Sequence, residues 1–537
     1  MAGLWFGPGK PDMNVFLEPF VDECSALATD GFNWTCPETD VCMRCTATAV
    51  VCVCDAVARP LVQNFKQFNG HYGCGFCFDI GESIEKGRGW TTVYAFQNSM
   101  TLRSRDNTRA LVLEAVETGK PCMGVKGPSL LSLISGFDII KGLVPDYMHC
   151  ICLGVVRQMM SLWLDTKNHN EPFYIGQLTQ TVDTKLLSIK PPCNISRTPR
   201  SILQFKFWKA HEWLVWLLYY SLPVLRDVQP AAYYANWALL VDCVAILLGV
   251  EITPAQLVYC ERGFKAFVAD FEKLYGKKHM SFNVHQTLHL VQSVYDWGPL
   301  WSHSAFIFES YNAVLLNMVQ GTQGVPMQIL HTFYLHRAIP LNVKSVLPQC
   351  SASQRRVIHT LTSHQHQIKS AIKVTSGVTM LGLPNYRTLN RSHYVALHSV
   401  SDVVNYQAVV AYYNRAVVYG NIVHSLYYCN TLKRNSYTVR LADDRYYQID
   451  TFVITDLGSG EQCYALGRYL YEVPFKFCSS AATVLKLKHL IAVSKVPSAL
   501  VAIVATDIVK KCVFISLNCC RVNFVCDHQI HSLESCT

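Results

Sequence analysis

The stretch GHYGCGFC, residues 70–77, and the stretch NVHQTLHL, residues 283–290, decide how the chain can fold. The first ends in a Cys-x2-Cys pair, and the second contains a His-x3-His pair. Zinc prefers four tetrahedral nitrogen and sulfur ligands, and each pair has the spacing of half a site. On a helix, the histidines lie one turn apart on the same face. The sequence therefore predicts a zinc site that joins two distant segments through Cys74, Cys77, His285 and His289.

Spacing alone leaves a simpler interpretation open, in which the two cysteines are buried thiols and the histidines are ordinary helix residues. The chain contains 23 Cys and 19 His, so a chance Cys-x2-Cys pair is common, and Cys42 and Cys45 form another. The N-terminus lacks the basic and apolar regions of a secretory signal. The cysteines are therefore expected to be reduced thiols and metal ligands rather than a disulfide framework.

A carboxylate accompanies each half of the predicted zinc site. The β-branched run 46–54 predicts a buried strand, and Asp55 stands at its C-terminal end. The ends of central strands are where α/β folds commonly place chemistry. Glu309 follows the histidine pair after an apolar run. Asp55 can instead cap the next helix, and Glu309 can instead be a buried, paired carboxylate.

Composition indicates a packed globular protein. Of 537 residues, 50% are apolar and 16% are charged, which excludes a disordered chain and suggests about two to four domains. The net charge of +9 is compatible with a polyanionic partner but does not require one. The apolar stretches 213–225 and 235–250 are shorter than the roughly 20 residues of a spanning helix, so we expect buried core helices and no membrane partner.

The pattern along the chain divides it into successive regions. Strands and helices alternate first, aromatic-rich helices follow, and short strands separated by turns fill the C-terminal part. The predicted regions are 1–144, an α/β core; 145–280, a helical insertion; 281–340, a return to the core with the histidine pair; 341–394, a linker; and 395–537, a β-rich domain.

An ordered set of motifs resembles the CACTA (EnSpm-like) DNA transposases of animal genomes over roughly residues 1–340. The motifs are CDAVARP (54–60), GHYGCGFC (70–77), PDYMHCICLGVVRQ (145–158), RTPRSILQFKFWKAHEWLVWLLYYSLPVL (197–225) and NVHQTLHLVQSVYDWGPLWSHSAFIFES (283–310). The resemblance implies an RNase H-like catalytic core with a large helical insertion, a DDE/D triad that uses Mg2+ or Mn2+, a structural zinc ion, DNA as partner (transposon ends and target), and a nuclear location. Dimerisation is expected by analogy with transposase assemblies. The layout is also similar to that of the V(D)J recombinase catalytic subunit.

The resemblance assigns roles to individual residues. Asp55 is the second catalytic acid and Glu309 the third, and the Cys and His pairs are the zinc ligands. Asp146 and His149 match a D-x2-H signature of these transposases, although a local N-cap is an equally good interpretation. A group of nearby cations can contact DNA phosphates or simply form a solvated face; it consists of Arg197, Arg200, Lys206 and Lys209.

The chain departs from this family at its beginning. The first catalytic aspartate of the family lies on a strand that precedes the segment matching residues 3–17, and this chain begins at Met1. The first strand and the first aspartate are therefore expected to be missing. Since two acids hold a pair of metal ions poorly, we expect a transposase-derived protein with impaired activity. The alternative is a domesticated, non-catalytic protein that binds DNA or chromatin.

Overall fold

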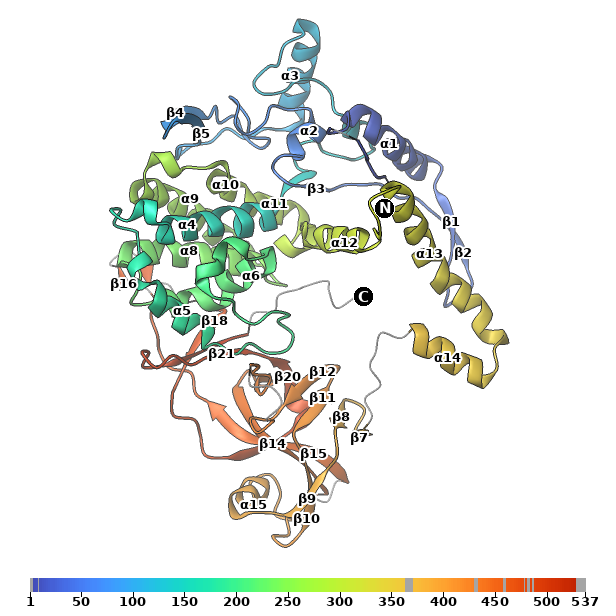
Figure 1. Ribbon diagram of the computed structural model, residues 1–537, viewed down its shortest axis with the longest axis vertical. Helices are drawn as coiled ribbons and strands as arrows, with labels where there is room; N and C mark the ends of the chain where they lie inside the picture. Colours follow the sequence, from blue (N-terminus) through green and yellow to red (C-terminus); the bar gives the residue numbers. More distant parts are fainter. Residues whose placement is uncertain are drawn as a thin grey trace. The chain divides into compact units, whose positions relative to one another are not determined.

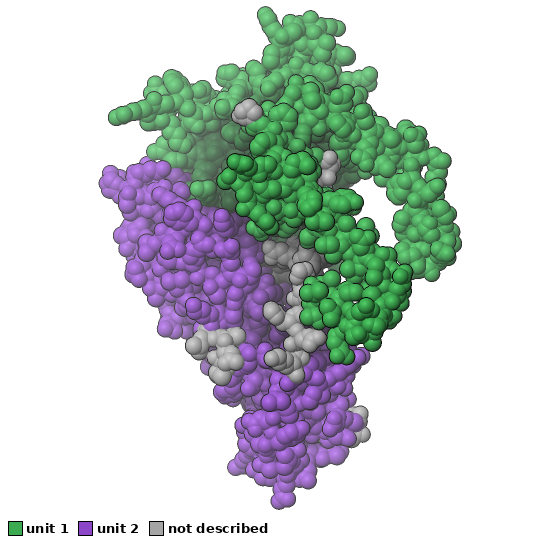
Figure 2. Space-filling view, turned by 45° about the vertical axis from the view of Figure 1, so that its right-hand side comes forward, with its two compact units in different colours: residues 1–158, 246–364, 531–537 green, residues 159–245, 365–530 purple. Residues whose placement is uncertain are grey.

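The computed structural model describes residues 3–7, 9–362, 370–428, 433–456, 460–477, 479–480, 483–484 and 487–527. The chain forms two compact units, each built from segments distant in sequence (Figure 2). Unit 1 contains residues 1–158 and 246–364, and unit 2 contains residues 159–245 and 365–530. The region 145–280, expected as one helical insertion, therefore contributes to both units.

The first part of unit 1 combines short strands with helices. It opens with α1 (Met13–Thr29), whose first turn is capped by the Asp12 carboxylate. The elements that follow are β1 (Phe32–Thr35), β2 (Cys42–Cys45), β3 (Cys52–Cys54), α2 (Arg59–Gln63), β4 (Glu82–Lys86), β5 (Gly89–Val93), α3 (Arg105–Thr118) and β6 (Leu143–Pro145) (Figure 1).

Strands β3 and β6 form a parallel pair, in which Cys54 lies opposite Pro145. The strand predicted over residues 46–54 is too long, because only the last three of these residues form a strand. The three residues are half-buried and not buried. Among the described residues, β6 is the one strand that pairs with β3. A β-branched composition favours a strand, but it does not by itself provide a second strand with which the run can form hydrogen bonds. Both strands end directly before an aspartate, Asp55 after β3 and Asp146 after β6.

The second part of unit 1 is helical. A π-helix, Met148–Val156, follows β6 and packs against α10. A Cβ atom on Gly154 would lie 2.7 Å from Asn283 Cγ, so glycine permits this close approach. The remaining helices are α9 (Pro254–Tyr275), α10 (Phe282–Gln286), α11 (Leu290–Trp297), α12 (Phe306–Asn317), α13 (Val325–Val346) and α14 (Ala352–Thr362).

The helices of unit 2 form an aromatic core. Trp163 and Trp237 meet edge to face with ring centroids 5.1 Å apart, and Trp213 and Trp216 are fully buried. The apolar stretch 213–225 therefore contributes to a buried core, as its length predicts. The helices are α4 (Arg157–Leu164), α5 (Thr179–Leu187), α6 (Ala210–Val215), α7 (Ser221–Leu225) and α8 (Ala231–Leu247), of which α4 and α8 cross the boundary with unit 1.

The β part of unit 2 contains several antiparallel sheets. The largest has the order β19-β15-β14-β10-β9, with β13 and β20 joined to it, and a second has the order β12-β11-β8-β7. The elements are β7 (Ala371–Lys373), β8 (Val378–Leu381), β9 (Asn385–Thr388), α15 (Arg391–His398), β10 (Val409–Tyr413), β11 (Arg415–Val418), β12 (Asn421–His424), β13 (Thr438–Leu441), β14 (Tyr446–Asp456), β15 (Glu461–Leu470), β16 (Ser479–Ser480), β17 (Thr483–Val484), β18 (Leu490–Val493), β19 (Val501–Val504), β20 (Ile508–Lys511), β21 (Val513–Ile515) and β22 (Asn523–Cys526).

The prediction of a linker at residues 341–394 is wrong. This stretch contains α14 and the strands β7, β8 and β9, and β9 pairs with β10. All residues of β9 are exposed and its sequence is NYRT, so it lacks the apolar alternation that marks a half-buried strand. None of the cysteines among the described residues forms a disulfide. Within the described chain, no helix is both long and apolar enough to span a membrane.

Candidate functional site

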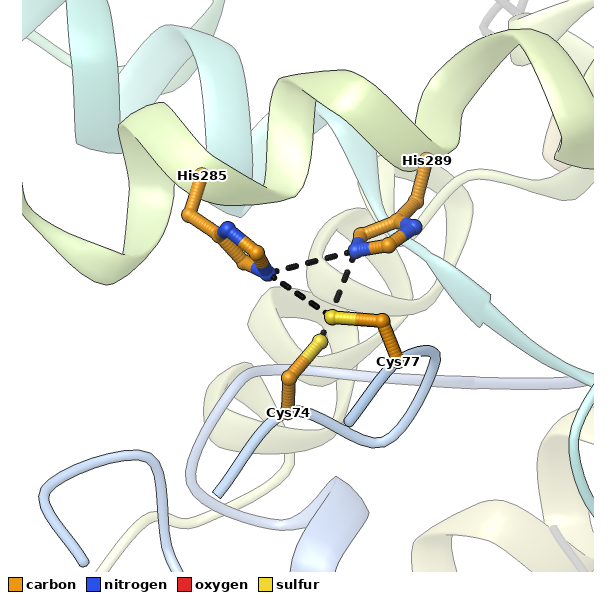
Figure 3. Close-up of side chains that lie close together, drawn as sticks. All are labelled: Cys74, Cys77, His285 and His289. Carbon is orange, nitrogen blue, oxygen red and sulfur yellow. Dashed lines mark hydrogen bonds between the residues drawn. The ribbon is translucent and has the colours of Figure 1, made fainter. Parts of the chain in front are cut away.

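Four side chains from two distant segments of unit 1 converge on one point (Figure 3). Cys74 and Cys77 come from the loop after α2, and His285 and His289 come from α10 and the 3-10 turn that follows it. Their side chains are almost fully buried, and their ligand atoms all lie within 4.8 Å of one another. The structure thus brings the four predicted ligands together, as a buried cluster that suits a metal ion such as zinc.

The distances inside the cluster fit tetrahedral coordination. Metal bonds of about 2.0–2.1 Å to nitrogen and about 2.3 Å to sulfur place neighbouring ligand atoms about 3.3–3.8 Å apart. The Nε2 atoms of His285 and His289 are 3.3 Å apart. The Cys77 Sγ–His285 Nε2 and Cys74 Sγ–His289 Nε2 distances are 3.3 and 3.5 Å. These three distances therefore match one tetrahedral coordination sphere, and all four atoms lie within 4.8 Å of one another.

The cysteine loop is held by tight backbone packing and by one arginine. A Cβ atom on Gly73 would lie 2.3 Å from the carbonyl oxygen of Gln67, so a larger residue there would displace the loop. Arg103 is buried, and its Nε donates to the carbonyl oxygens of both Cys74 and Cys77 at 3.0 and 3.1 Å. A guanidinium also favours two thiolates electrostatically. Arg103 was not predicted as a site residue, because its position in the sequence carries no spacing signal.

A buried carboxylate stands behind one of the histidines. Asp79 Oδ2 lies 3.7 Å from Nδ1 of His285, and its other oxygen accepts from the backbone N–H of Gly81. Carboxylates behind metal-binding histidines orient the ring and raise its basicity. Asp79 was also missed, although it lies only two residues after Cys77. The histidine pair was expected on one α-helix, but α10 ends at Gln286 and a 3-10 turn carries His289.

The electrostatics of the cluster favour the form that binds a metal ion at two of its four residues, Cys74 and His289. Burial raises the pKa of the Cys74 thiol, but a hydrogen bond from Cys77 and the two imidazoles outweigh it and leave this pKa well below its ordinary value. Burial lowers the pKa of His289 and keeps its ring neutral. Metal binding requires thiolate and neutral imidazole. The other two ligands are shifted the opposite way: the hydrogen bond with Cys74 and burial raise the pKa of the Cys77 thiol, and burial lowers the pKa of His285 but the Cys74 thiolate raises it by more.

The predicted acids gather at the ends of the parallel strands. Asp146 is buried, and its Oδ1 accepts from the backbone N–H of Ala305, at the start of α12. Its Oδ2 accepts from His149, through the backbone N–H at 3.0 Å and through Nδ1 at 2.7 Å. Asp55 is half-exposed, and one of its oxygens accepts from the backbone N–H groups of Val57 and Ala58, as a cap does.

Glu309 joins this acid cluster from α12. Its carboxylate lies 3.9 Å from Nε2 of His149, and 53% of the side chain is exposed, so the buried-carboxylate interpretation does not hold. The hydrogen bond to Asp146 raises the pKa of His149, and the negative charges of Asp146, Asp55 and Glu309 raise it further, against the effect of burial. Asp55, Asp146, His149 and Glu309 therefore form one electrostatic group.

Arg59 connects the metal cluster to the acid cluster. This buried side chain donates to Oε1 of Gln286 at 2.9 Å, and its guanidinium lies 4.7 Å from the ring centroid of Phe76. Its helix, α2, begins just after Asp55, and Gln286 stands next to His285. The position of one cluster is therefore tied to the position of the other.

The basic side chains proposed for DNA contact lie in unit 2. Arg200 bonds to Glu212 at 3.0 Å, and Lys206 bonds to Asp165 at 3.0 Å. Arg197 and Lys209 are exposed. Two of the four cations are thus partly neutralised by local partners. A scan against protein-family models and a search of curated proteins each gave no match to this chain.

We expect the purified protein to contain about one metal ion per chain, and the variant Cys74→Ser/His289→Ala to lose it. Two ligands of a four-coordinate site are removed, so the remaining pair cannot retain the ion. Elemental mass spectrometry measures the content, and circular dichroism checks the fold.

The variant Cys42→Ser/Cys45→Ser is the matched control, because it removes the other Cys-x2-Cys pair, which lies on the exposed strand β2. It should keep the full metal content. A well-folded wild-type protein without metal would contradict the assignment of the cluster.

The His149–Asp146 interaction should make stability depend on pH. The folded pKa of His149 is raised, so the interaction stabilises the fold fully below the unfolded pKa of about 6.5 and is lost as pH rises through the folded pKa. His149→Gln should therefore destabilise the protein most at pH 5.5, by about 1 kcal/mol, and less at each higher pH. Thermal unfolding over this pH range measures the difference.

The exposed pair His398 and Asp402, 3.8 Å apart, provides the control. His398→Gln should change stability little at any pH, because exposed ion pairs contribute little. An effect of His149→Gln that is constant with pH would show that the imidazole acts through packing and not through charge.

Proposed function

We propose that this chain is a transposase-derived protein, related to cut-and-paste DNA transposition, with an RNase H-like core in unit 1. The observation that carries the proposal is the acid cluster. Asp55 and Asp146 follow two paired parallel strands, and α12 brings Glu309 to the same place. The motif resemblance over residues 1–340 supports the same conclusion, and its implied partner is DNA in the nucleus.

The chemistry of such a cluster is phosphodiester transfer. Mg2+ or Mn2+ ions, held by carboxylates, activate the attacking oxygen and stabilise the leaving oxygen. Asp55 and Glu309 have exposed carboxylate surface with which to hold such ions. His149 would lie beside them as a cation, positioned by Asp146.

We also propose that catalysis is strongly impaired. Asp146 is buried and already accepts three hydrogen bonds, so it acts as a positioning residue and not as a metal ligand. That leaves two available carboxylates in the cluster. The raised pKa of His149 favours the protonated ring, whose positive charge next to Glu309 would oppose the binding of a divalent cation.

The buried Cys2His2 cluster is proposed as a structural zinc site. Thiolate and imidazole ligands select zinc over Mg2+, and tetrahedral sites with four protein ligands are structural because no position is open to substrate. In this role, zinc joins the loop of Cys74 to α10 and so holds the two segments that flank the acid cluster.

The second candidate function is non-catalytic binding of DNA or chromatin. The hydrogen bonds that occupy both oxygens of Asp146 favour this second candidate, because they remove a carboxylate from the chemistry without disturbing the fold. Both candidates predict DNA binding, and a residual strand cleavage that depends on Glu309 distinguishes the first candidate from the second.

A cleavage assay on supercoiled and linear duplex DNA, with Mg2+ or Mn2+, tests the proposal. We expect the cleavage rate of the wild type to exceed that of the Glu309→Gln variant by no more than about tenfold. A site that already lacks one of its three acids has lost most of its transition-state stabilisation, so removing Glu309 as well changes the rate little. Both proteins should bind the same DNA with equal, salt-dependent affinity.

Robust cleavage that disappears in Glu309→Gln would contradict the impairment and establish an active enzyme. Glu261→Gln is the control, since Glu261 is an exposed carboxylate on α9 that pairs with Lys265. Absence of DNA binding by a well-folded wild-type protein would overturn both candidate functions.

A further inference from the structure

Two cysteines outside the metal cluster bring their sulfur atoms together on β3. Cys52 and Cys54 are the first and last residues of this three-residue strand, and their Sγ atoms lie 3.5 Å apart. Residues i and i+2 of a strand project to the same side of it, so the backbone itself holds the two thiols next to each other. The parallel pairing of β3 with β6, in which Cys54 lies opposite Pro145, keeps this part of the backbone extended.

The pair is accessible to a small reagent and is not built as a metal site. Cys52 and Cys54 are both partly exposed, whereas Cys74 and Cys77 of the metal cluster are fully buried. A structural zinc site needs four protein ligands. Over the part of the chain that the structure describes, the metal cluster is the one group of three or more potential ligands close enough to share an ion. The two thiols of β3 are therefore available for thiol chemistry.

A strand allows a disulfide between these positions, at the upper limit of the usual geometry. The rise of about 3.2–3.4 Å per residue separates the Cα atoms of residues i and i+2 by about 6.4–6.8 Å. Disulfides occur with Cα separations of about 4.4–6.8 Å and place the sulfur atoms about 2.05 Å apart. The 3.5 Å between the two sulfur atoms can therefore close if β3 bends or shortens slightly. A disulfide that distorts the backbone is reduced more readily than a structural one, so this bond should be reversible.

We propose that Cys52 and Cys54 are a redox-active dithiol, which reacts with low-molecular-mass disulfides such as glutathione disulfide and closes to an intramolecular disulfide. The reaction has two steps. Cys52 loses its proton and attacks one sulfur of glutathione disulfide, whose S–S bond breaks as the first glutathione leaves as a thiolate and takes up a proton. Cys54 then loses its proton and attacks Sγ of Cys52, and the second glutathione leaves in the same way. The two protein thiols are oxidised to one disulfide, and one glutathione disulfide is reduced to two thiols.

The hydrogen bond between the two thiols gives them different roles. It lowers the pKa of Cys52, against the effect of burial. It raises the pKa of Cys54, in the same direction as burial. Because the thiolate is the nucleophile in disulfide exchange, Cys52 is the thiol that attacks the reagent, and Cys54 is the thiol that displaces glutathione afterwards.

The disulfide also bears on the acid cluster, and this step rests on the proposed function. Asp55 directly follows Cys54, and its carboxylate accepts from the backbone N–H groups of Val57 and Ala58 at the start of α2. A bond that bends or shortens β3 therefore moves the Asp55 carboxylate relative to the other acids. The oxidised protein should consequently bind Mn2+ more weakly than the reduced protein.

Peptide mass spectrometry of the purified full chain tests the proposal. After equilibration with glutathione and glutathione disulfide, the remaining thiols are alkylated. The peptide that contains Cys52 and Cys54 should lack two alkyl groups, and dithiothreitol should restore both. Cys54→Ser should accumulate at least ten times more mixed disulfide between Cys52 and glutathione than wild type, because it lacks the thiol that displaces glutathione.

Cys45→Ser is the matched control, because it removes a nearby cysteine on β2 and should leave the disulfide intact. A well-folded wild type in which Cys52 and Cys54 both remain open to alkylation at the most oxidising ratio would overturn the proposal. Equal amounts of mixed disulfide in wild type and in Cys54→Ser would overturn it as well, and so would a disulfide that joins either residue to another cysteine.

Electron paramagnetic resonance of free Mn2+ tests the link to the acid cluster. Oxidation should weaken the binding of Mn2+ at least threefold in wild type and leave it unchanged in Cys52→Ser/Cys54→Ser. Equal affinity in both redox states of the wild type would overturn this link. A reduced protein that binds no Mn2+ would instead count against the proposed function, while the disulfide is established or refuted by peptide mass alone.

Discussion

The close approach of two thiols and two imidazoles is the interaction on which unit 1 depends. Cys74 and His289 are separated by 215 positions, and their ligand atoms lie 3.5 Å apart. Closing so long a segment of chain costs conformational entropy, and burying four polar groups without a ligand costs more. A bound metal ion would offset both, because it would satisfy all four atoms at once and add its binding free energy to folding.

The position of the acid cluster depends on the close approach of the Cys74 loop and α10. α10 carries His285 and also Gln286, which accepts from Arg59, and α2, which carries Arg59, begins just after Asp55. On the other side, the Asp146 carboxylate holds the N–H at the start of α12 and thereby the helix that carries Glu309. The Cys and His cluster, the arginine and the aspartate thus link α2, α10, β6 and α12 around the acid cluster.

Much of the site could be predicted from the sequence, because its members carry local signals. The Cys and His pairs have ligand spacing, and Asp55 ends a β-branched run. Arg103 and Asp79 could not be found in this way, since their roles come from carbonyl oxygens and a ring that only the fold brings near. The same holds for β9, which is an exposed strand identified by its pairing with β10 and by nothing in its composition.

Asp146 shows how one residue can serve structure at the expense of chemistry. A metal ligand needs free lone pairs directed at an open position, but those of Asp146 are directed at Ala305 and at His149. Releasing either would leave a buried N–H or a ring nitrogen without a partner, at a cost of about 1–3 kcal/mol each. The carboxylate is therefore more stable as a clamp between β6 and α12 than as a ligand. The acids therefore stay close together in space. In the proposed function, Asp55 and Glu309 are the two that hold cations, and Asp146 positions them.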